Sequence, residues 1–600
     1  MGTVIIALCF VFAWGGVLAY FGKATMDETC CIAVCSIIIL LYISGLAGKL
    51  DWGFYFVNFM IITGCILALG KLCLGAKNRE TLLYRIKESG CTKGMPALMA
   101  MVLVWIVLVQ DRGICHWDEF SHWGLTVKNM WILDKMPYVS ESSVTFKSYP
   151  PATALFEYYF VRFDDHVFKE YTMYYAYNFM AYSFLMPVYK LIHRYNIITF
   201  FIILVIPLVF FRSYYTLLLV DSMLGITYCS LILCWYGNDG GRKTDIIRAG
   251  CICFIYPLMK SSGFGLCLLT ILYALFSAMS ESENNRKKKV LIVVTSGVVS
   301  LVSRLIWTLC LKYHKVDTSF YSLGSMQKSL KECIKIARHY IHEIVWGNNT
   351  NEILHFSVLV WVILLLSGQI VIFIKTKKVS VFFFSIGVAV YAVFLCVVYC
   401  LNMGIDTALS LGSYARYISP VILGTFMAEI FIILKNADKI WITGITAAFV
   451  FALSIRGMKE GITDIQGKID KTKNIQVQYE NKKAFEHIAP EDQVCFIAQN
   501  TFGTPYNMSI YVNAPVHFTV CRSYSLGKPY SESDQVTYPV SYKELERFLY
   551  HNCKYLYIYQ ADEQFTDRYG SLFQDKDDIR ANTLYCVRKE CNSVRLELKQ

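Results

Sequence analysis

Long apolar segments, separated by short polar ones, follow one another along the first three quarters of the chain. The hydrocarbon core of a bilayer is about 30 Å thick, so a spanning helix needs about 20 apolar residues. The pattern predicts about 12 to 14 membrane-spanning helices. They lie within residues 3–21, 30–48, 53–73, 95–110, 171–191, 197–211, 214–236, 246–259, 262–279, 290–311, 353–374, 379–401, 414–434 and 440–456. Residues 1–456 are therefore expected to form an all-α polytopic membrane domain with large outer loops at 111–170 and 312–352.

The pattern changes after residue 456. Residues 494–498, 555–559 and 584–587 are rich in β-branched and aromatic side chains and predict short strands. Residues 541–550 open with a Ser followed three positions later by Glu, which is typical of a helix start, and residues 482–488 predict a further helix. We expect residues 457–600 to form a small α/β domain. It contains no nucleophile elbow, glycine-rich phosphate loop or metal motif, which favours an acceptor-binding or structural cap.

The composition supports this division. Of the 600 residues, 55% are hydrophobic and 17% charged, and the mean hydropathy is +0.43. Soluble domains have about 25% charged residues, so a disordered chain and an ordinary cytosolic enzyme are excluded. Residues 457–600 carry 18 basic and 19 acidic residues, whereas residues 1–456 carry 39 and 26. The basic excess belongs to the membrane domain, where cytoplasmic loops are enriched in Lys and Arg, and no nucleic-acid partner is expected.

The basic residues also predict the orientation of the chain. Five clusters fall between predicted spans and are assigned to the cytoplasm. They are Lys71, Lys77, Arg79, Arg85, Lys87 and Lys93; Arg242 and Lys243; Arg286, Lys287, Lys288 and Lys289; Lys375, Lys377 and Lys378; and Lys435 and Lys439. This orientation places the N-terminus, the two large loops and the C-terminal domain outside. We expect a multi-pass protein of the cell membrane with an extracytoplasmic C-terminal domain.

Two adjacent carboxylates, Asp118 and Glu119, stand among aromatic residues in the string 116–123, His-Trp-Asp-Glu-Phe-Ser-His-Trp, just after a predicted span. Desolvation and a like-charged neighbour both raise the pKa of a carboxyl group, which suits Asp118 for general-base work on a hydroxyl. The string is equally compatible with a solvated loop whose Trp residues lie at the membrane interface. His116 and His122 could join Asp118 around a metal, but no ligand spacing enforces this. We expect no required cofactor, with a divalent metal left open.

Three further ionisable residues, Asp221, Lys260 and Arg416, interrupt apolar segments, and the predicted topology places all of them on the outer side with Asp118 and Glu119. Ionisable residues at such depth usually face a cavity or a partner. Carboxylates with separated cations suit a reaction in which a hydroxyl attacks and a phosphate leaves, because Lys and Arg neutralise the departing charge. Taken singly, Lys260 and Arg416 could also extend to lipid headgroups, and Asp221 could pair structurally with a neighbouring helix.

The order of these motifs resembles the C-type (GT-C) membrane glycosyltransferases, a superfamily that includes protein O-mannosyltransferases and the aminoarabinose transferases of lipid A. The resemblance covers roughly residues 97–435. It is carried by Trp117-Asp118-Glu119, Tyr149-Pro150-Pro151, Asp221, Lys260-Ser261-Ser262-Gly263, and Arg416-Tyr417 followed by Pro420. It implies Asp118 as the catalytic base, with Glu119 supporting it or contacting the acceptor. Lys260 and Arg416 would hold the donor phosphate, with Asp221, His122, Tyr149 and Tyr417 in supporting roles. His122-Trp123 departs from what many members carry, which leaves the acceptor open.

The expected function is transfer of a sugar from a polyprenyl-phosphate donor to an extracytoplasmic glycan, lipid or protein acceptor, with membrane lipids as surroundings. One alternative is a transporter or flippase of lipid-linked saccharide, which would predict internal repeats and broken helices near the midplane. Another is a ligase that joins glycans to lipid.

Overall fold

The computed structural model describes residues 1–73, 92–192, 196–237, 242–318, 328–347, 356–532, 534–590 and 593–599. The chain divides into two compact units: unit 1 holds Met1–Asp111 and Ser148–Gln466, and unit 2 holds Arg112–Lys147 and Gly467–Gln600. Four of the basic residues that predict the orientation, Lys77, Arg79, Arg85 and Lys87, lie outside the described residues. The orientation in the membrane stays a prediction.

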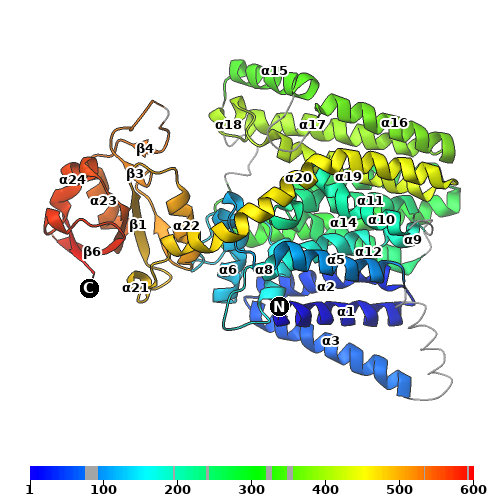
Figure 1. The fold of residues 1–600 in the computed structure, drawn as a ribbon, viewed down its shortest axis with the longest axis horizontal. Helices are drawn as coiled ribbons and strands as arrows, with labels where there is room; N and C mark the ends of the chain where they lie inside the picture. The colour runs from blue at the N-terminus through cyan, green and yellow to red at the C-terminus, as the bar shows by residue number, and fades with distance from the viewer. Residues whose placement is uncertain are drawn as a thin grey trace. The chain divides into compact units, whose positions relative to one another are not determined.

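Unit 1 is helical, and its long helices lie side by side with roughly aligned axes (Figure 1). Its α-helices are α1 (Gly2–Gly22), α2 (Met26–Leu46), α3 (Leu50–Cys73), α5 (Gly94–Val109), α7 (Ala152–Val161), α8 (Tyr171–Leu185), α9 (Val188–Leu191), α10 (Asn196–Val205), α11 (Val220–Gly237), α12 (Lys243–Ile255), α13 (Ser261–Met279), α14 (Glu283–Tyr313), α15 (Leu330–Trp346), α16 (Val358–Thr376), α17 (Phe383–Leu401), α18 (Ile405–Leu409), α19 (Tyr414–Lys435) and the part of α20 (Ile440–Tyr479) up to Gln466. Short 3₁₀ turns occur at η2 (Ile206–Val209), η3 (Tyr214–Thr216), η4 (Tyr256–Leu258) and η6 (Val379–Phe382).

Among the described residues, nine helices are long and apolar enough to cross a membrane, and they match nine of the predicted spans. This confirms a polytopic helical protein. The other five predicted spans are shorter or broken. The segment 95–110 forms the 16-residue α5, and 214–236 is divided between η3 and α11. The remaining three are interrupted at Pro187, Pro207 and Pro257, because proline lacks the N–H that a continuous helix requires.

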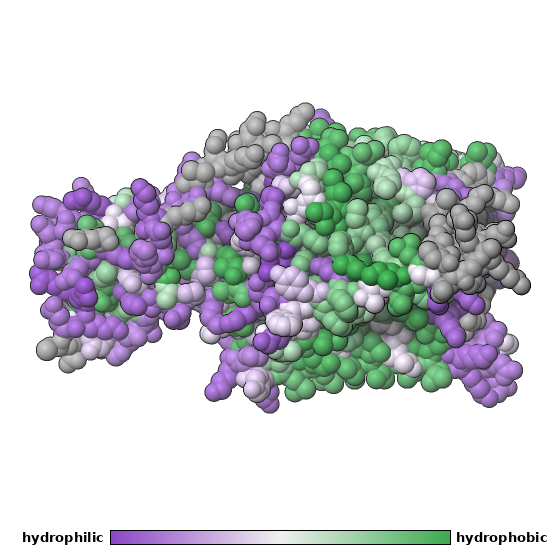
Figure 2. All heavy atoms as spheres, turned by 90° about the horizontal axis from the view of Figure 1, so that it is seen from below, coloured by the Kyte–Doolittle hydropathy of each residue, from purple (hydrophilic) through white to green (hydrophobic). Residues whose placement is uncertain are grey.

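The surface of unit 1 fits a bilayer. In Figure 2, hydrophobic residues form a broad band on the visible face of unit 1, bordered by hydrophilic residues. Large apolar side chains such as Leu309, Ile363 and Val393 are more than half exposed. Isolated exposed apolar residues are ordinary in soluble proteins, but a continuous band over several long helices marks a membrane surface.

Unit 2 is a small α/β domain. It contains the π-helical turn η1 (Glu119–Trp123), helices α6 (Gly124–Leu133), α21 (Lys482–Phe485), α22 (Thr504–Val512), α23 (Tyr542–Asn552) and α24 (Glu563–Tyr569), and the 3₁₀ turns η7 (Gly570–Leu572) and η8 (Lys576–Asp578). Its strands are β1 (Gln493–Ala498), β2 (His517–Thr519), β3 (Ser525–Leu526), β4 (Thr537–Tyr538), β5 (Tyr555–Gln560), β6 (Thr583–Glu590) and β7 (Ser593–Leu598). The described strands give one five-stranded sheet in the order β2-β1-β5-β6-β7 and a two-stranded pair β3-β4.

The sheet of unit 2 is mixed. Strand β1 pairs in parallel with β2 and β5, so that Cys495 faces Leu556, and β6 then pairs antiparallel with β5 and β7. Buried side chains of β1, β5 and β6 join Leu545 and Leu549 of α23 in one hydrophobic core. The three predicted strands and the helix at 541–550 are confirmed, including the Ser541 side chain that accepts the Glu544 backbone N–H. The helix predicted at 482–488 is shorter and ends at Phe485.

Residues 112–147, which we expected to form part of a loop of the membrane domain, group with unit 2. Lys128 of α6 donates to the carbonyl oxygens of Tyr511 (2.8 Å) and Val512 (3.2 Å) at the end of α22. The Gln476 side chain donates to the Ile114 carbonyl oxygen at 3.0 Å. The division between the units falls inside α20, between Gln466 and Gly467, ten residues beyond the predicted domain boundary.

Candidate functional site

The predicted site residues fall into two groups. Unit 1 holds Tyr149, Asp221, Lys260, Arg416 and Tyr417, and unit 2 holds Asp118, Glu119 and His122. Within unit 1, four of the five come together in what we call the Asp221 cluster: Asp221, Lys260, Arg416 and Tyr417.

Asp221 is the centre of this cluster. One carboxylate oxygen, Oδ1, lies 2.6 Å from Lys260 Nζ, and the other, Oδ2, lies 3.5 Å from Arg416 Nε. The Asp221 side chain is only 3% exposed, whereas those of Lys260 and Arg416 are 18% and 21% exposed. The carboxylate is therefore buried, whereas its two cations remain partly exposed. Two cations and one carboxylate give the cluster a formal charge of +1.

The Tyr417 ring supports both cations. Its centroid lies 5.1 Å from Lys260 Nζ and 5.2 Å from the central guanidinium carbon of Arg416. Arg416 Nη2 also donates to the Tyr417 hydroxyl at 3.5 Å. Cations over an aromatic face are attracted by the ring quadrupole, more strongly where water is excluded. The neighbours Arg416 and Tyr417 are therefore also in contact through their side chains.

Three helix N-termini meet at the cluster. Asp221 lies in the first turn of α11, Lys260 is the N-cap residue of α13, and Arg416 lies in the first turn of α19. The N-terminus of a helix carries a partial positive charge and N–H groups without intrahelical partners, and it attracts anions. The helix ends therefore reinforce the positive charge of Lys260 and Arg416.

Glycines allow the close helix packing that forms the cluster. A Cβ atom on Gly424 of α19 would lie 2.5 Å from the Gly225 carbonyl oxygen of α11, and one on Gly225 would lie 2.9 Å from the Pro420 carbonyl oxygen. Small residues let membrane helices approach in this way. A Cβ on Gly263 would lie 2.4 Å from the Tyr256 carbonyl oxygen, so the Lys-Ser-Ser-Gly motif contains a glycine required by the turn that positions Lys260.

The chain leading into α11 is also fixed. The Tyr177 hydroxyl of α8 lies 2.5 Å from the Leu219 carbonyl oxygen, to which it donates, and 2.6 Å from the Ser222 hydroxyl. These contacts hold the residues on both sides of Asp221. Tyr149, the fifth predicted residue of unit 1, is half-buried and lies three residues before the start of α7. The carbonyl oxygen of its neighbour Ser148 accepts the Trp307 indole N–H at 3.2 Å.

In unit 2, Asp118 and Glu119 have different surroundings. Glu119 is fully buried, and its Oε2 accepts the backbone N–H groups of Cys115 (3.3 Å) and His116 (3.1 Å). Asp118 is half-buried, and its backbone N–H donates to His116 Nδ1 at 3.3 Å. Glu119 therefore holds the chain just before Asp118, which makes it a positioning group for that segment.

His122 is buried against aromatic rings. It is 5% exposed, and its ring centroid lies 4.4 Å from the Trp123 ring and 5.6 Å from the Phe146 ring. Across the described residues, no group of three or more His, Cys, Asp or Glu side chains could hold a metal ion. The metal alternative involving His116, His122 and Asp118 receives no geometric support from them.

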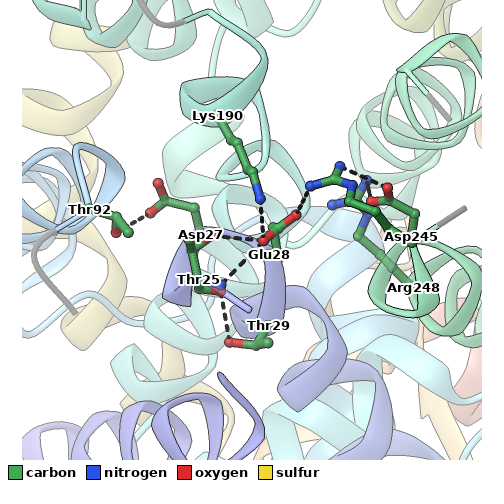
Figure 3. Close-up of polar contacts among 9 residues, drawn as sticks. Thr25, Asp27, Glu28, Thr29, Thr92, Lys190, Asp245 and Arg248 are labelled. Atoms are coloured by element: carbon green, nitrogen blue, oxygen red, sulfur yellow. Dashed lines mark hydrogen bonds and ion pairs between the residues drawn. The ribbon is translucent and has the colours of Figure 1, made fainter. Parts of the chain in front are cut away.

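Sequence reasoning missed a second charged cluster, which Figure 3 shows in part. We call it the pocket cluster and define it as Glu28, Lys190, Arg242, Asp245 and Arg248. Glu28 lies in the first turn of α2 and Asp245 in the first turn of α12. The adjacent pair Asp27-Glu28 repeats the Asp-Glu pattern of residues 118–119, and this was the available signal.

No protein-family model and no curated protein matches the chain. Membership of the GT-C superfamily stays a prediction from short motifs, and we infer function from the side chains and their charges.

Proposed function

We propose that the protein is a membrane glycosyltransferase that moves a sugar from a polyprenyl-phosphate donor to a hydroxyl of an extracytoplasmic glycan, lipid or protein. The observation that carries this proposal is the Asp221 cluster: a buried carboxylate that holds two partly exposed cations where three helices begin. Such a site favours an anionic group at the end of a membrane unit.

The charge of the cluster suits the donor. A polyprenyl-phosphate sugar is a phosphodiester with one negative charge, which the formal charge of +1 on Asp221, Lys260 and Arg416 neutralises. When the sugar leaves, the phosphate becomes a monoester and gains charge. The N–H groups of Lys260 and Arg416 already point to one carboxylate and need not reorganise to stabilise that developing charge. Preorganised hydrogen-bond donors of this kind lower the barrier to such a step.

The proposed reaction is a single displacement. An acceptor hydroxyl oxygen attacks the anomeric carbon of the sugar, the bond from that carbon to the phosphate oxygen breaks, and polyprenyl phosphate leaves. The hydroxyl proton passes to the Asp118 carboxylate, in the role that the sequence predicts. Glu119 positions the chain before Asp118 through the backbone of residues 115 and 116. No nucleotide is consumed, because the donor carries its own leaving group.

Purified protein in liposomes, supplied with a panel of labelled polyprenyl-phosphate hexoses and pentoses and a panel of glycan, glycolipid and peptide acceptors, tests the proposal. Wild-type protein is expected to release polyprenyl phosphate and label one acceptor class. Lys260→Met and Asp118→Asn are each expected to lower the rate by about 100-fold, the order expected when a charge stabiliser or a general base is removed.

The control is Lys375→Met, which removes a surface cation whose partner is Asp438. It should transfer at the wild-type rate. Turnover of no donor by wild-type protein, or full activity of Lys260→Met, would overturn the proposal. Movement of the lipid-linked sugar between leaflets without transfer would instead support the flippase alternative.

A further inference from the structure

A second site lies at the opposite end of α11 from Asp221. A pocket of about 230 Å³ is lined by side chains of the pocket cluster together with α8, α9 and α11 residues that include Ser230 and Cys234. At a helical rise of about 1.5 Å per residue, the stretch of α11 from Asp221 to Cys234 is about 20 Å long. The pocket is therefore separate from the Asp221 cluster and independent of the proposed transfer reaction.

Both carboxylates of the described pocket lining are paired with cations. Glu28, 2% exposed, lies 2.8 Å from Lys190 through Oε2 and 2.8 Å from Arg242 through Oε1. Asp245, 3% exposed, lies 2.7 Å from Arg242 through Oδ2 and 3.0 Å from Arg248 through Oδ1. Each of the four carboxylate oxygens thus faces a cation, and Arg242 joins the two carboxylates into one chain of charges.

The neighbouring carboxylate Asp27 is directed elsewhere. Figure 3 shows Asp27 pointing toward Thr92 and Glu28 pointing toward Lys190. Thr92 donates to Asp27 Oδ1 at 2.7 Å, and a Cβ on Gly94 would lie 2.4 Å from that same oxygen. Asp27 is therefore held away from the described pocket lining. That lining contains two carboxylates and three cations, so its formal charge is +1.

Hydrogen-bond donors are in surplus in this pocket. A lysine brings three N–H donors and an arginine five, so the three cations carry more donors than four carboxylate oxygens can accept. Arg248 is the clearest case, since it is 7% exposed and its Nε has no hydrogen-bond partner among the described residues. A buried donor left without a partner is costly, and an acceptor group that enters the pocket removes that cost.

From this surplus we infer that the pocket binds the phosphate group of a ligand. The ligand is expected to be an anion that offers several acceptor oxygens, because each carboxylate oxygen of the described lining already faces a cation and N–H donors are left over. Phosphate suits closely spaced Arg and Lys side chains, since it accepts from the arginine fork and from a point charge together. The pocket is also lined by Phe184, Val188 and Leu191, which can cover the carbon chain of a phosphate ester.

The phosphate can come from a lipid headgroup or from a soluble phosphate, and one experiment distinguishes them. Full-length protein in phosphatidylcholine nanodiscs is heated while tryptophan fluorescence reports unfolding. In the first arm, inorganic phosphate is titrated against potassium chloride at equal ionic strength. In the second arm, the nanodiscs contain a rising fraction of phosphatidic acid. A saturable rise in the unfolding temperature in the first arm identifies a soluble ligand, and one confined to the second identifies a lipid.

Variants decide whether the response belongs to the pocket. Lys190→Met and Arg242→Met, at side chains 36% and 53% exposed, should fold, and each should weaken the apparent affinity about tenfold, as expected for loss of one charge-assisted hydrogen bond. Arg248→Lys keeps the charge but loses the fork and should give a similar loss. Lys375→Met, outside the pocket lining, should respond like wild type. No saturable rise with either probe, or an unchanged response in Lys190→Met and Arg242→Met, would overturn the inference.

Discussion

The Asp221 cluster and the pocket cluster share one arrangement of charges but differ in what surrounds it. In both, a buried carboxylate in the first turn of a helix lies between two cations from other parts of unit 1. The Asp221 cluster has a single carboxylate and supports its cations on the Tyr417 ring. The pocket cluster has two carboxylates that share Arg242.

Because of this difference, the loss of one carboxylate should affect the two clusters unequally. Loss of Asp221 removes the only described carboxylate facing Lys260, whereas loss of Glu28 leaves Arg242 paired with Asp245 and lets the more exposed Lys190 turn to solvent. A ring can hold cations in place without neutralising them, and this keeps their charge for a ligand. In the pocket cluster a second carboxylate and a third cation take the place of the ring, and the formal charge of the cluster is again +1.

The largest expected effect comes from comparing Asp221→Asn with Glu28→Gln. Removing one partner of a buried ion pair leaves uncompensated charge, so we expect Asp221→Asn to lower the free energy of unfolding by about 3 kcal/mol. Glu28→Gln should cost about 1 kcal/mol, because its cations retain a carboxylate or solvent. Unfolding in detergent, followed by tryptophan fluorescence, measures both. Equal losses would contradict the claimed difference between the clusters.

Gly424→Ala should disturb the Asp221 cluster and leave the pocket cluster unchanged. Its new Cβ would meet the Gly225 carbonyl oxygen and Tyr228, so α19 must move away from α11, at a cost of about 2 kcal/mol. Because Arg416 and Asp221 lie on these helices, transfer activity should fall while the response to phosphate at the pocket is retained. Gly444→Ala is the matched control, since nothing lies within 4 Å of its added Cβ.

Replacement of the aromatic support should give a smaller effect. Tyr417→Leu removes the ring beneath Lys260 and Arg416 and should cost about 1 kcal/mol, the size of a partly desolvated cation–π contact. Tyr417→Phe keeps the ring and should recover most of that loss. If the ring positions the cations for the donor, the Michaelis constant for the donor rises in Tyr417→Leu more than in Tyr417→Phe. Identical constants in the two variants would exclude that role.

The smallest effect is expected at an exposed pair. Lys375 lies 2.8 Å from Asp438, with side chains 45% and 73% exposed. Surface ion pairs contribute between about 0 and 1 kcal/mol, so Lys375→Met should change the free energy of unfolding by less than about 0.5 kcal/mol. A larger loss would mean that the exposure of an ion pair does not predict its contribution to the free energy of unfolding, in the two buried clusters as well.

Much of unit 1 could be predicted because apolar length is a local property of the chain. The nine long spans followed from counting residues, and Asp221, Lys260 and Arg416 stood out because charges are rare within apolar segments. Predicted spans failed where proline interrupts the helix, at Pro187, Pro207 and Pro257, although the apolar run continues across each. Hydropathy measures solubility in lipid and is insensitive to a missing backbone N–H.

The pocket cluster was not predicted, because the Asp27-Glu28 pair was its only sequence signal and that pair has an ordinary explanation. Thr25 and Glu28 form a capping box, which is the common meaning of such a pair at a helix start. The cations that face Glu28 come 162 and 214 residues later, at Lys190 and Arg242. Only the packing of α2 against α12 and α8 brings these positions together.

By itself, the sequence determined that this chain forms a polytopic helical body followed by a small α/β domain, since periodicity and apolar length act over neighbouring residues. It also singled out the charges that are expensive in an apolar segment. The tertiary structure alone decided which charges share a carboxylate, that residues 112–147 belong with the C-terminal domain, and that a charged pocket lies at the far end of α11. Ion pairs depend on distances of a few ångströms between residues far apart in the chain, and only the packing of helices fixes those distances.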